Sequence, residues 1–242
     1  GTLLEIGAGA GYFMDEARKK GFQPYGLEFN PIQAHHIRNT LNLPCEESSF
    51  TRPVFDGMKF DVVYHCDVIS HFYNPVSDFR EINKKMKDDS FLIFETGNLG
   101  EVDPAYFRYY DTFQYPDHLF FFTRENIITL LEKTGFELVK MYRYSIIPHL
   151  MAINCLSGVK RFIKKLLGRT GNKNGSPDSE VGGDGNGSRC QTPEADSGFK
   201  KRLRNIIHYV FYLFRYRIGR IVPKAGRPQT LIIVARKRNV YE

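Results

Sequence analysis

Residues 2–12 of the chain are Thr-Leu-Leu-Glu-Ile-Gly-Ala-Gly-Ala-Gly-Tyr, and this stretch decides the fold. Its apolar first half predicts a short buried strand, and the residues from Tyr12 to Lys20 predict a helix. The glycines between them, Gly7, Gly9 and Gly11, predict a tight turn. Glycine tolerates positive φ and has no Cβ that would keep a ligand away from the backbone. A glycine-rich turn between a strand and a helix is typical of nucleotide-binding α/β folds.

The spacing of these glycines restricts the kind of nucleotide. A dinucleotide site has the pattern G-x-G-x-x-G, which would need a glycine where this chain has Tyr12. The chain has E-x-G-x-G-x-G instead, beginning at Glu5. A second acid, Glu28, ends the next predicted strand, Gln23–Glu28, and follows Gly11 by 17 positions. An acid at that place in a Rossmann half accepts hydrogen bonds from ribose hydroxyls, so we expect Glu28 to bind a ribose.

Strand and helix signals alternate over the first 145 residues, which predicts an α/β fold with helices on both faces of a sheet. Asn30 and Thr123 are the expected N-caps of two helices. A long aromatic loop is expected over residues 97–122. The further strands are expected at Leu43–Glu46, Phe60–His65, Phe91–Glu95, Phe136–Tyr144 and Thr230–Arg236, and the further helices at Pro31–Leu41, Pro75–Met86 and Thr123–Lys133.

The E-x-G-x-G-x-G pattern resembles motif I of the class I S-adenosylmethionine (SAM)-dependent methyltransferases. The resemblance covers residues 2–145 and 230–237. It implies a Rossmann-like seven-stranded sheet whose last two strands are antiparallel, with SAM as the cofactor and no metal. The cofactor-binding residues that it implies are Glu5, Gly7, Gly9, Gly11, Glu28, Phe29, Glu47, Ser48, Cys66 and Asp67.

The resemblance also gives these residues roles. The glycine turn is expected to pass the methionine portion of SAM close to the backbone, and Glu28 to bind the ribose. Glu5 is expected to support the turn or to reach the cofactor through water. The residue that approaches the adenine stays open among Glu46, Glu47 and Ser48.

Two histidines are candidate catalytic residues. His71 follows the fourth strand, whose first acid, Asp61, we expect to order the start of the strand. Histidine titrates near neutral pH, so His71 could act as a base toward a hydroxyl acceptor; the alternative is a packed histidine that orders a loop. His118 opens the sequence H-L-x-x-F-T, which resembles a subgroup containing quinone O-methyltransferases and polysaccharide-cluster enzymes. His118 is expected either to contact the acceptor or close the site, or to be structural.

The end of the chain differs in charge from the beginning. The net charge is +7, but residues 1–150 hold 15 Lys and Arg against 21 Asp and Glu, whereas residues 151–242 hold 19 against 6. The predicted division is a SAM-binding domain, 1–145 plus 228–242, and a basic helical insertion, 146–227. The insertion is expected to contain amphipathic helices at 151–167 and 199–221, joined by a disordered linker at 168–198.

The basic amphipathic helices have three interpretations. They could lie on an anionic membrane surface, pack on the methyltransferase domain, or bind nucleic acid. Nucleic acid is disfavoured, because the apolar faces are wide and no recognised binding motif accompanies them. The expected acceptor is a small molecule, a sugar, or a lipid-linked glycan or quinone, methylated on oxygen. A peripheral location at the inner face of a membrane follows as an expectation.

Composition and motif spacing argue against other classes. Four scattered cysteines without a C-x-x-C pair disfavour zinc and disulfide frameworks and favour a reducing cytoplasm. A nicotinamide-dependent reductase is disfavoured by the glycine spacing and by the lack of a Tyr-x-x-x-Lys pair after the fourth strand. A SAM-binding or membrane-tethered scaffold without catalysis stays open. The chain begins on a strand without an initiator Met, so we expect it to be part of a longer protein.

Overall fold

The computed structural model describes residues 1–48, 55–109, 118–146 and 225–238, together with a few residues between 206 and 217. Contacts divide the chain into two units, residues 1–146 with 220–242, and residues 147–219. Most of the predicted insertion, including the helix at 151–167 and the linker at 168–198, lies outside the described residues.

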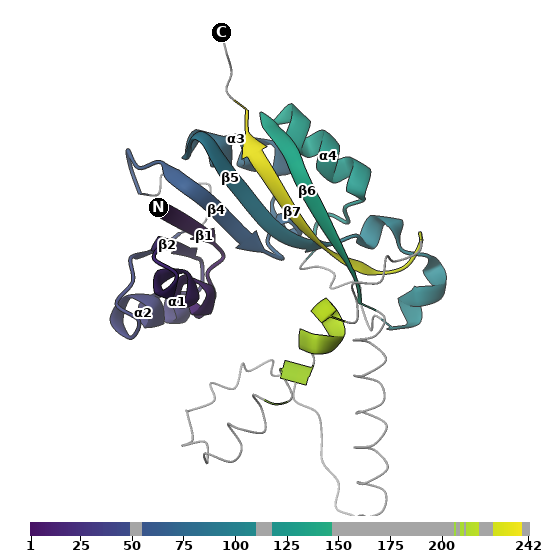
Figure 1. Cartoon of the computed structure of the whole chain (residues 1–242), viewed down its shortest axis with the longest axis horizontal. Helices are drawn as coiled ribbons and strands as arrows, with labels where there is room; N and C mark the ends of the chain where they lie inside the picture. The colour runs from purple at the N-terminus through teal and green to yellow at the C-terminus, as the bar shows by residue number, and fades with distance from the viewer. Residues whose placement is uncertain are drawn as a thin grey trace, which may run out of the picture. The chain divides into compact units, whose positions relative to one another are not determined.

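The first unit contains a seven-stranded sheet with the strand order β3-β2-β1-β4-β5-β7-β6 (Figure 1). Neighbouring strands from β1 to β5 are parallel, whereas β7 is antiparallel to both β5 and β6. The predicted α/β fold and the antiparallel last pair are therefore confirmed. The strands are β1 (Thr2–Ile6), β2 (Gln23–Glu28), β3 (Cys45–Glu47), β4 (Phe60–Cys66), β5 (Met86–Gly97), β6 (Phe136–Ser145) and β7 (Gln229–Lys237).

The helices begin where the sequence supplies capping residues. The Asn30 side chain accepts hydrogen bonds from the backbone of Ile32 and Gln33 at the start of α2. At the start of α4, Thr123 and Asn126 form the reciprocal pair of a capping box. The α-helices are α1 (Tyr12–Lys19), α2 (Pro31–Asn39), α3 (Pro75–Lys84) and α4 (Arg124–Lys133), and the 3₁₀ turns are η1 (Ile69–His71), η2 (Leu99–Glu101) and η3 (Pro104–Tyr109).

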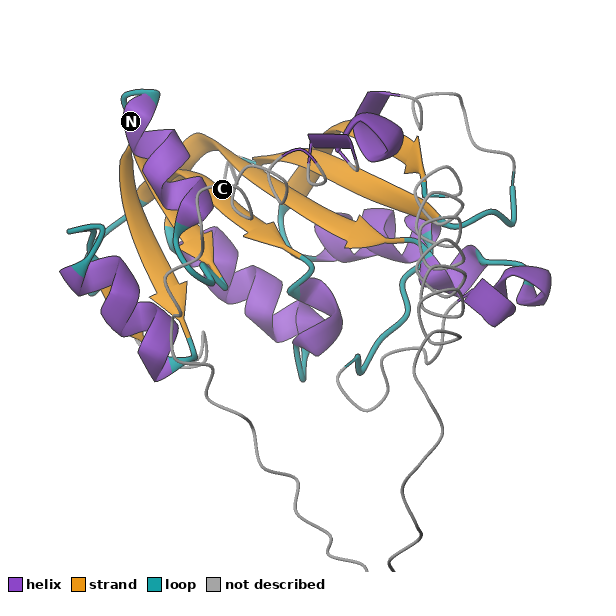
Figure 2. Cartoon of the chain, turned by 90° about the horizontal axis from the view of Figure 1, so that it is seen from below, coloured by secondary structure: helices purple, strands orange, loops and turns teal. Residues whose placement is uncertain are grey.

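The helices lie on both faces of the sheet (Figure 2). A Cβ added at Gly26 of β2 would lie 2.6 Å from the Met14 sulfur, so this glycine faces α1. The adjacent Leu27 belongs to the large hydrophobic cluster that includes residues of α3 and α4. Successive residues of a strand point to opposite faces, so α1 covers one face of the sheet, and α3 and α4 cover the other.

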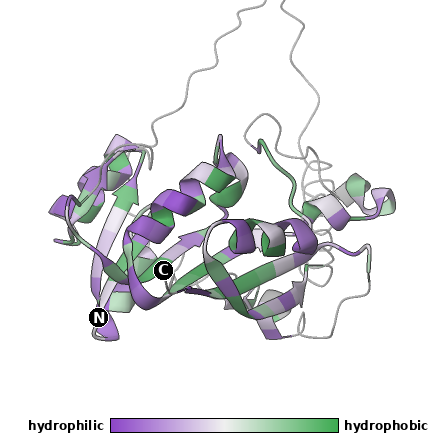
Figure 3. Cartoon of the chain, turned by 90° about the horizontal axis from the view of Figure 1, so that it is seen from above, coloured by the Kyte–Doolittle hydropathy of each residue, from purple (hydrophilic) through white to green (hydrophobic). Residues whose placement is uncertain are grey.

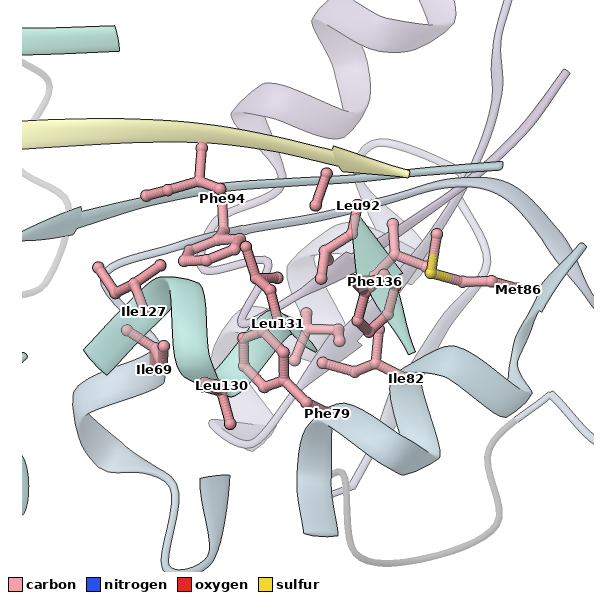
Figure 4. Packing of buried hydrophobic residues seen from close by; sticks show 14 of the residues in the cluster. Ile69, Phe79, Ile82, Met86, Leu92, Phe94, Ile127, Leu130, Leu131 and Phe136 are labelled. Carbon is pink, nitrogen blue, oxygen red and sulfur yellow. The ribbon is translucent and has the colours of Figure 1, made fainter. Parts of the chain in front are cut away.

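The larger hydrophobic core lies between α3, α4 and the centre of the sheet (Figure 4). Phe79 and Ile82 of α3 and Leu131 of α4 meet Phe94 of β5 and Phe136 of β6, all essentially buried. Figure 3 shows apolar and polar segments side by side along the helices, as expected for helices that cover a sheet. This packing fixes the positions of the strand ends, where the site lies.

Several predicted boundaries are wrong by a few residues. The helix expected at Pro75–Met86 ends at Lys84, because buried Met86 already pairs with Phe60 as the first residue of β5. The third strand, Cys45–Glu47, begins two positions later and ends one position later than predicted. The helix expected to reach Leu41 ends at Asn39, β5 extends well beyond Phe91–Glu95, and the described part of loop 97–122 contains η2 and η3.

Asp61 orders the start of β4, as predicted. Its carboxylate accepts hydrogen bonds from the Thr2 backbone N–H (2.6 Å) and hydroxyl (2.9 Å), which fastens β4 to β1. Lys87 Nζ lies 2.9 Å from the same carboxylate. The Lys87 and Thr2 donors favour the charged form and hold the pKa of Asp61 at about 2.

A polar cluster holds together the ends of β6 and β7. The buried Asn98 side chain accepts from the Gln229 backbone N–H (2.7 Å) and donates to the Arg227 carbonyl (3.3 Å). Arg143 Nε donates to Gln229 Oε1 over 2.8 Å. Strands β6 and β7 therefore stay paired up to Ser145 and Gln229, close to both ends of the long connection that joins the two strands.

In the second unit, the described residues belong to the helix expected at 199–221. They include a short π-helical turn, η4 (Leu213–Arg217), and the rings of Tyr212 and Tyr216 lie 5.5 Å apart. Ile206, Tyr209 and Tyr212 are exposed. No helix among the described residues has the length and apolar character needed to cross a membrane.

Candidate functional site

A pocket of about 460 Å³ lies at the carboxyl ends of β1 and β2. The strand order reverses between β1 and β4, and such a reversal is where open α/β sheets bind ligands. Five of the predicted site residues line the pocket, namely Gly7, Glu28, Phe29, Ser48 and His71. The other lining residues are Ile6, Leu27, Val68, Phe72, Tyr73 and Asp78.

The three motif glycines have different physical roles. All have positive φ, with values of 72° at Gly7, 54° at Gly9 and 75° at Gly11. A Cβ at Gly11 would lie 2.8 Å from Ile37 Cγ1, and one at Gly7 would lie 2.7 Å from Val68 Cγ2. Nothing lies within 4 Å of a Cβ added at Gly9. Gly7 and Gly11 thus permit close packing, whereas Gly9 leaves open space beside the turn.

Glu28 connects the glycine turn to the pocket. Its Oε2 accepts from the Gly9 backbone N–H over 2.6 Å, and its Oε1 accepts from the Asn30 backbone N–H over 2.8 Å. A carboxylate offers about four acceptor positions, so about two are left for a ligand. Glu28 is buried yet lines the pocket. The carboxylate is therefore fixed in place and able to accept from ribose hydroxyls.

Glu5 lies behind the turn and does not line the pocket. Burial raises the pKa of its carboxyl to about 8; the Met14 backbone N–H that donates to it acts in the opposite direction, and nearby Glu28 raises it further. Its Oε2 is buried and has no hydrogen-bond partner among the described residues. The hydrogen bond to Met14 fits the predicted role of supporting the turn and the helix that follows.

The structure distinguishes the three candidates for the adenine end. Ser48 lines the pocket, as does Phe29, a residue that is 78% exposed. Glu46 instead accepts from the backbone N–H of Phe55 over 2.7 Å, and Glu47 lies 3.7 Å from an Arg38 guanidinium nitrogen. Ser48 is therefore the candidate that the structure places at the pocket.

The two candidate catalytic histidines are neighbours. Their ring centroids are 4.9 Å apart and nearly perpendicular. The Ser70 carbonyl accepts from the Leu119 backbone N–H over 2.8 Å, which holds the segment of His118 against η1. His71 lines the large pocket, while His118 and Asp67 line a smaller cavity of about 20 Å³. Two motifs that are 47 positions apart in the chain thus meet at one site.

Cys66 and Asp67 follow β4 at the same edge of the sheet. Asp67 has a φ of 53°, and its backbone N–H donates to the Glu95 carbonyl over 2.9 Å. Neither residue lines the large pocket. Possible metal-ligand atoms of Cys66, Asp67 and Glu95 lie within 4.8 Å of one another. Such groupings are common without an ion, so the absence of a metal stays a prediction.

Sequence reasoning missed three polar or aromatic residues of the pocket, Phe72, Tyr73 and Asp78. Asp78 is only 8% exposed although it belongs to the first turn of α3, and Tyr73 is 87% exposed. The sequence offers a weak signal for Asp78, because an acid in the first turn is also what helix capping predicts. Tertiary structure alone distinguishes an acid at a pocket from one in solvent.

The residues present fit SAM. A volume of about 460 Å³ is within the usual range for a small-molecule pocket, roughly 300–1,000 Å³. The open space at Gly9 is suited to a close approach of a ligand to the backbone, and the fixed carboxylate of Glu28 is suited to ribose hydroxyls. A family model described as a methyltransferase domain matches residues 1–141. The chain belongs to this methyltransferase-domain family.

Solved structures with the same fold are methyltransferases and related enzymes. A proposed sarcosine dimethylglycine methyltransferase of Galdieria sulphuraria has a TM-score of 0.57 at 15% identity, over 98% of this chain and 78% of the other. Mycolic acid cyclopropane synthase CmaA1, solved with S-adenosylhomocysteine (SAH), gives 0.57 at 14% over the same shares. At these sequence identities, the similarity shows that this chain shares the fold of these two proteins.

A third similar structure is phosphoethanolamine N-methyltransferase 2 of Haemonchus contortus, also in complex with SAH. Its TM-score is 0.55 at 15% identity, over 98% of this chain and 49% of the other. No curated protein matches the chain. The family match and the two SAH complexes support SAM as the cofactor.

Proposed function

We propose that this chain transfers the methyl group of SAM to a small-molecule acceptor and that the donor binds in the 460 Å³ pocket. The observation that carries the proposal is the contact between Glu28 and the Gly9 backbone N–H at the pocket. It links an acid suited to ribose hydroxyls with a turn that leaves space for the methionine portion. Ser48 and Phe29 flank the adenine end.

For methyl transfer from SAM, the protein mainly has to position the donor and the acceptor. The methyl group of a sulfonium is already activated, so alignment of donor and acceptor supplies most of the catalysis. We propose an oxygen acceptor, whose hydroxyl proton needs a base. His71, at the pocket and in ring contact with His118, is the proposed base, and His118 orients it or contacts the acceptor.

The cofactor assignment is tested by calorimetric titration with SAH. The parent chain is expected to bind SAH, and Glu28→Ala to bind it roughly 10- to 100-fold more weakly, since a hydrogen bond to a charged group is worth about 1.5–3 kcal/mol. Glu16→Ala is the matched control, because Glu16 is an exposed acid on α1 that does not line the pocket, and its loss should leave affinity unchanged. Absence of SAH binding by the parent would contradict the proposal.

The catalytic role is tested with methyl-labelled SAM and a small-molecule extract as the source of acceptors. The parent is expected to transfer label, and His71→Asn to do so at least tenfold more slowly, because general base catalysis typically contributes about 10²–10⁴. Its SAH affinity should be retained. SAH binding without any transfer would favour the second candidate, a SAM-binding scaffold.

We further propose an acceptor of the quinone or lipid-linked glycan kind. The support is the H-L-x-x-F-T sequence at His118 and the basic charge of residues 151–242. The exposed Ile206, Tyr209 and Tyr212 are compatible with a peripheral contact to anionic lipid through 199–221. Binding of the chain to anionic but not to neutral vesicles would support this proposal.

A further inference from the structure

The side chains around the large pocket form an unusual set of charges. Among its described lining residues, Glu28 and Asp78 carry carboxylates, and none is lysine or arginine. Phe29, Phe72 and Tyr73 add aromatic rings to this lining, and His71 adds an imidazole. Aromatic faces and carboxylates both attract cations. The pocket is thus suited to a ligand that is partly apolar and positively charged.

Asp78 is the carboxylate of this lining that has no role in the proposed function. It is 8% exposed, and burial of its carboxyl raises its pKa. The backbone N–H of Asn74 donates to the carboxylate, and Glu81 adds a like charge nearby. The hydrogen bond fixes Asp78 at the start of α3 and leaves acceptor positions that a ligand can face.

We infer that Asp78 is a specificity-determining residue that favours the positively charged methyl donor over its uncharged thioether product. This inference rests on the proposed function, since it requires SAM in the pocket. The sulfur of SAM carries an additional methyl group and a positive charge, whereas SAH is the uncharged thioether left after methyl transfer. A buried carboxylate on the pocket wall therefore adds affinity for SAM that SAH cannot gain, which favours release of the product.

The aromatic wall strengthens the same preference. Tyr73 is 87% exposed, and Phe29 is 78% exposed, so both rings are available to a ligand. Glu28 is already engaged by two backbone N–H groups, which partly neutralise its effect on a distant charge. Asp78 receives one such hydrogen bond, from Asn74, and is the less compensated of the two carboxylates.

The experiment measures dissociation constants of the full chain for SAM, SAH and sinefungin, an analogue with a protonated amine in place of the sulfonium. In Asp78→Asn, affinity for SAM and sinefungin is expected to fall roughly three- to tenfold, as for a carboxylate several ångströms from a cation. Affinity for SAH should not change. Asn keeps an oxygen for the Asn74 N–H, so the start of α3 is retained.

Two further variants make the test decisive. Glu81→Gln removes a half-exposed carboxylate three residues along the same helix and should behave as the parent. Asp78→Ser offers a second neutral acceptor for Asn74 should the Asn variant fail to fold. An equal loss for SAM and SAH, or no loss for either, would overturn the inference. If the parent binds none of the three ligands, the proposed function itself fails.

Discussion

Replacing His65 by Leu is expected to make the protein less sensitive to acid. In the parent, His65 should lower the free energy of unfolding by about 3 kcal/mol between pH 7 and pH 4, and the Leu variant should lack this loss. His65 is completely buried in β4, stacked on Phe94 at 4.8 Å and edge-on to Phe79. Both ring nitrogens lack a hydrogen-bond partner among the described residues. Burial without a polar partner lowers the pKa of His65 to about 3.

The direction of the effect follows from proton uptake. The unfolded chain protonates His65 near its ordinary pKa of 6.5, whereas the folded chain resists protonation down to about pH 3. The unfolded state binds more protons across this interval, so the free energy of unfolding falls as the pH falls. In the Leu variant this contribution is absent, and any packing change shifts stability equally at each pH.

Urea denaturation followed by circular dichroism at pH 4, 5, 6 and 7 measures the prediction. His35→Gln is the matched control, because His35 is an exposed histidine on α2 and its replacement should leave the pH dependence unchanged. If His65→Leu loses stability with acid as steeply as the parent, the histidine is not held neutral in the core.

In the parent, Glu5 should lower the free energy of unfolding by about 3 kcal/mol as the pH rises from 5 to 8. Replacing Glu5 by Gln is expected to remove this loss. The folded chain keeps Glu5 protonated up to a pKa of about 8, because its carboxyl is buried and Glu28 lies nearby. The unfolded chain releases that proton near pH 4.5. The stability associated with the protonated form is complete below pH 4.5 and is lost as the pH rises through 8.

The measurement is the free energy of unfolding of parent and variant at pH 5, 6, 7 and 8. Gln retains an oxygen for the Met14 N–H, and it cannot ionise. Glu16→Gln on α1 removes an exposed carboxylate and should follow the parent at every pH. His65 makes the opposite contribution to the parent over part of this interval, so the difference between parent and variant is the quantity that decides. A Glu5→Gln variant whose free energy of unfolding follows that of the parent at every pH would show that Glu5 is ionised in the folded state.

The two buried groups were not predicted as stability determinants. His65 appears in the sequence as one residue of an apolar strand, and Glu5 as the acid of a glycine motif. The pKa of His65 depends on its burial among side chains of α3 and β5. The pKa of Glu5 depends mainly on its burial, and less on the nearby Glu28. Burial and proximity of this kind are set by tertiary packing and cannot be inferred from the local sequence pattern.

The sequence by itself determined where the strands and helices lie, to within a few residues, and the glycine turn with Glu28 beside it. Each depends on local rules: alternation of apolar residues, side-chain caps at Asn30 and Thr123, and the positive φ that Gly7, Gly9 and Gly11 tolerate. The position of Glu28 after Gly11 follows from the length of one βαβ unit. Local patterns suffice here because neighbours in the sequence form the structure.

Tertiary structure decided which residues share a pocket. It placed His71 beside His118, brought Asp78 and Tyr73 to the pocket wall, and put Ser48 there in place of Glu46 or Glu47. It also ended α3 before Met86, because pairing with Phe60 outweighs the helical pattern. Contacts between residues far apart in the chain depend on the order of strands in the sheet. That order cannot be inferred from the sequence of any single segment.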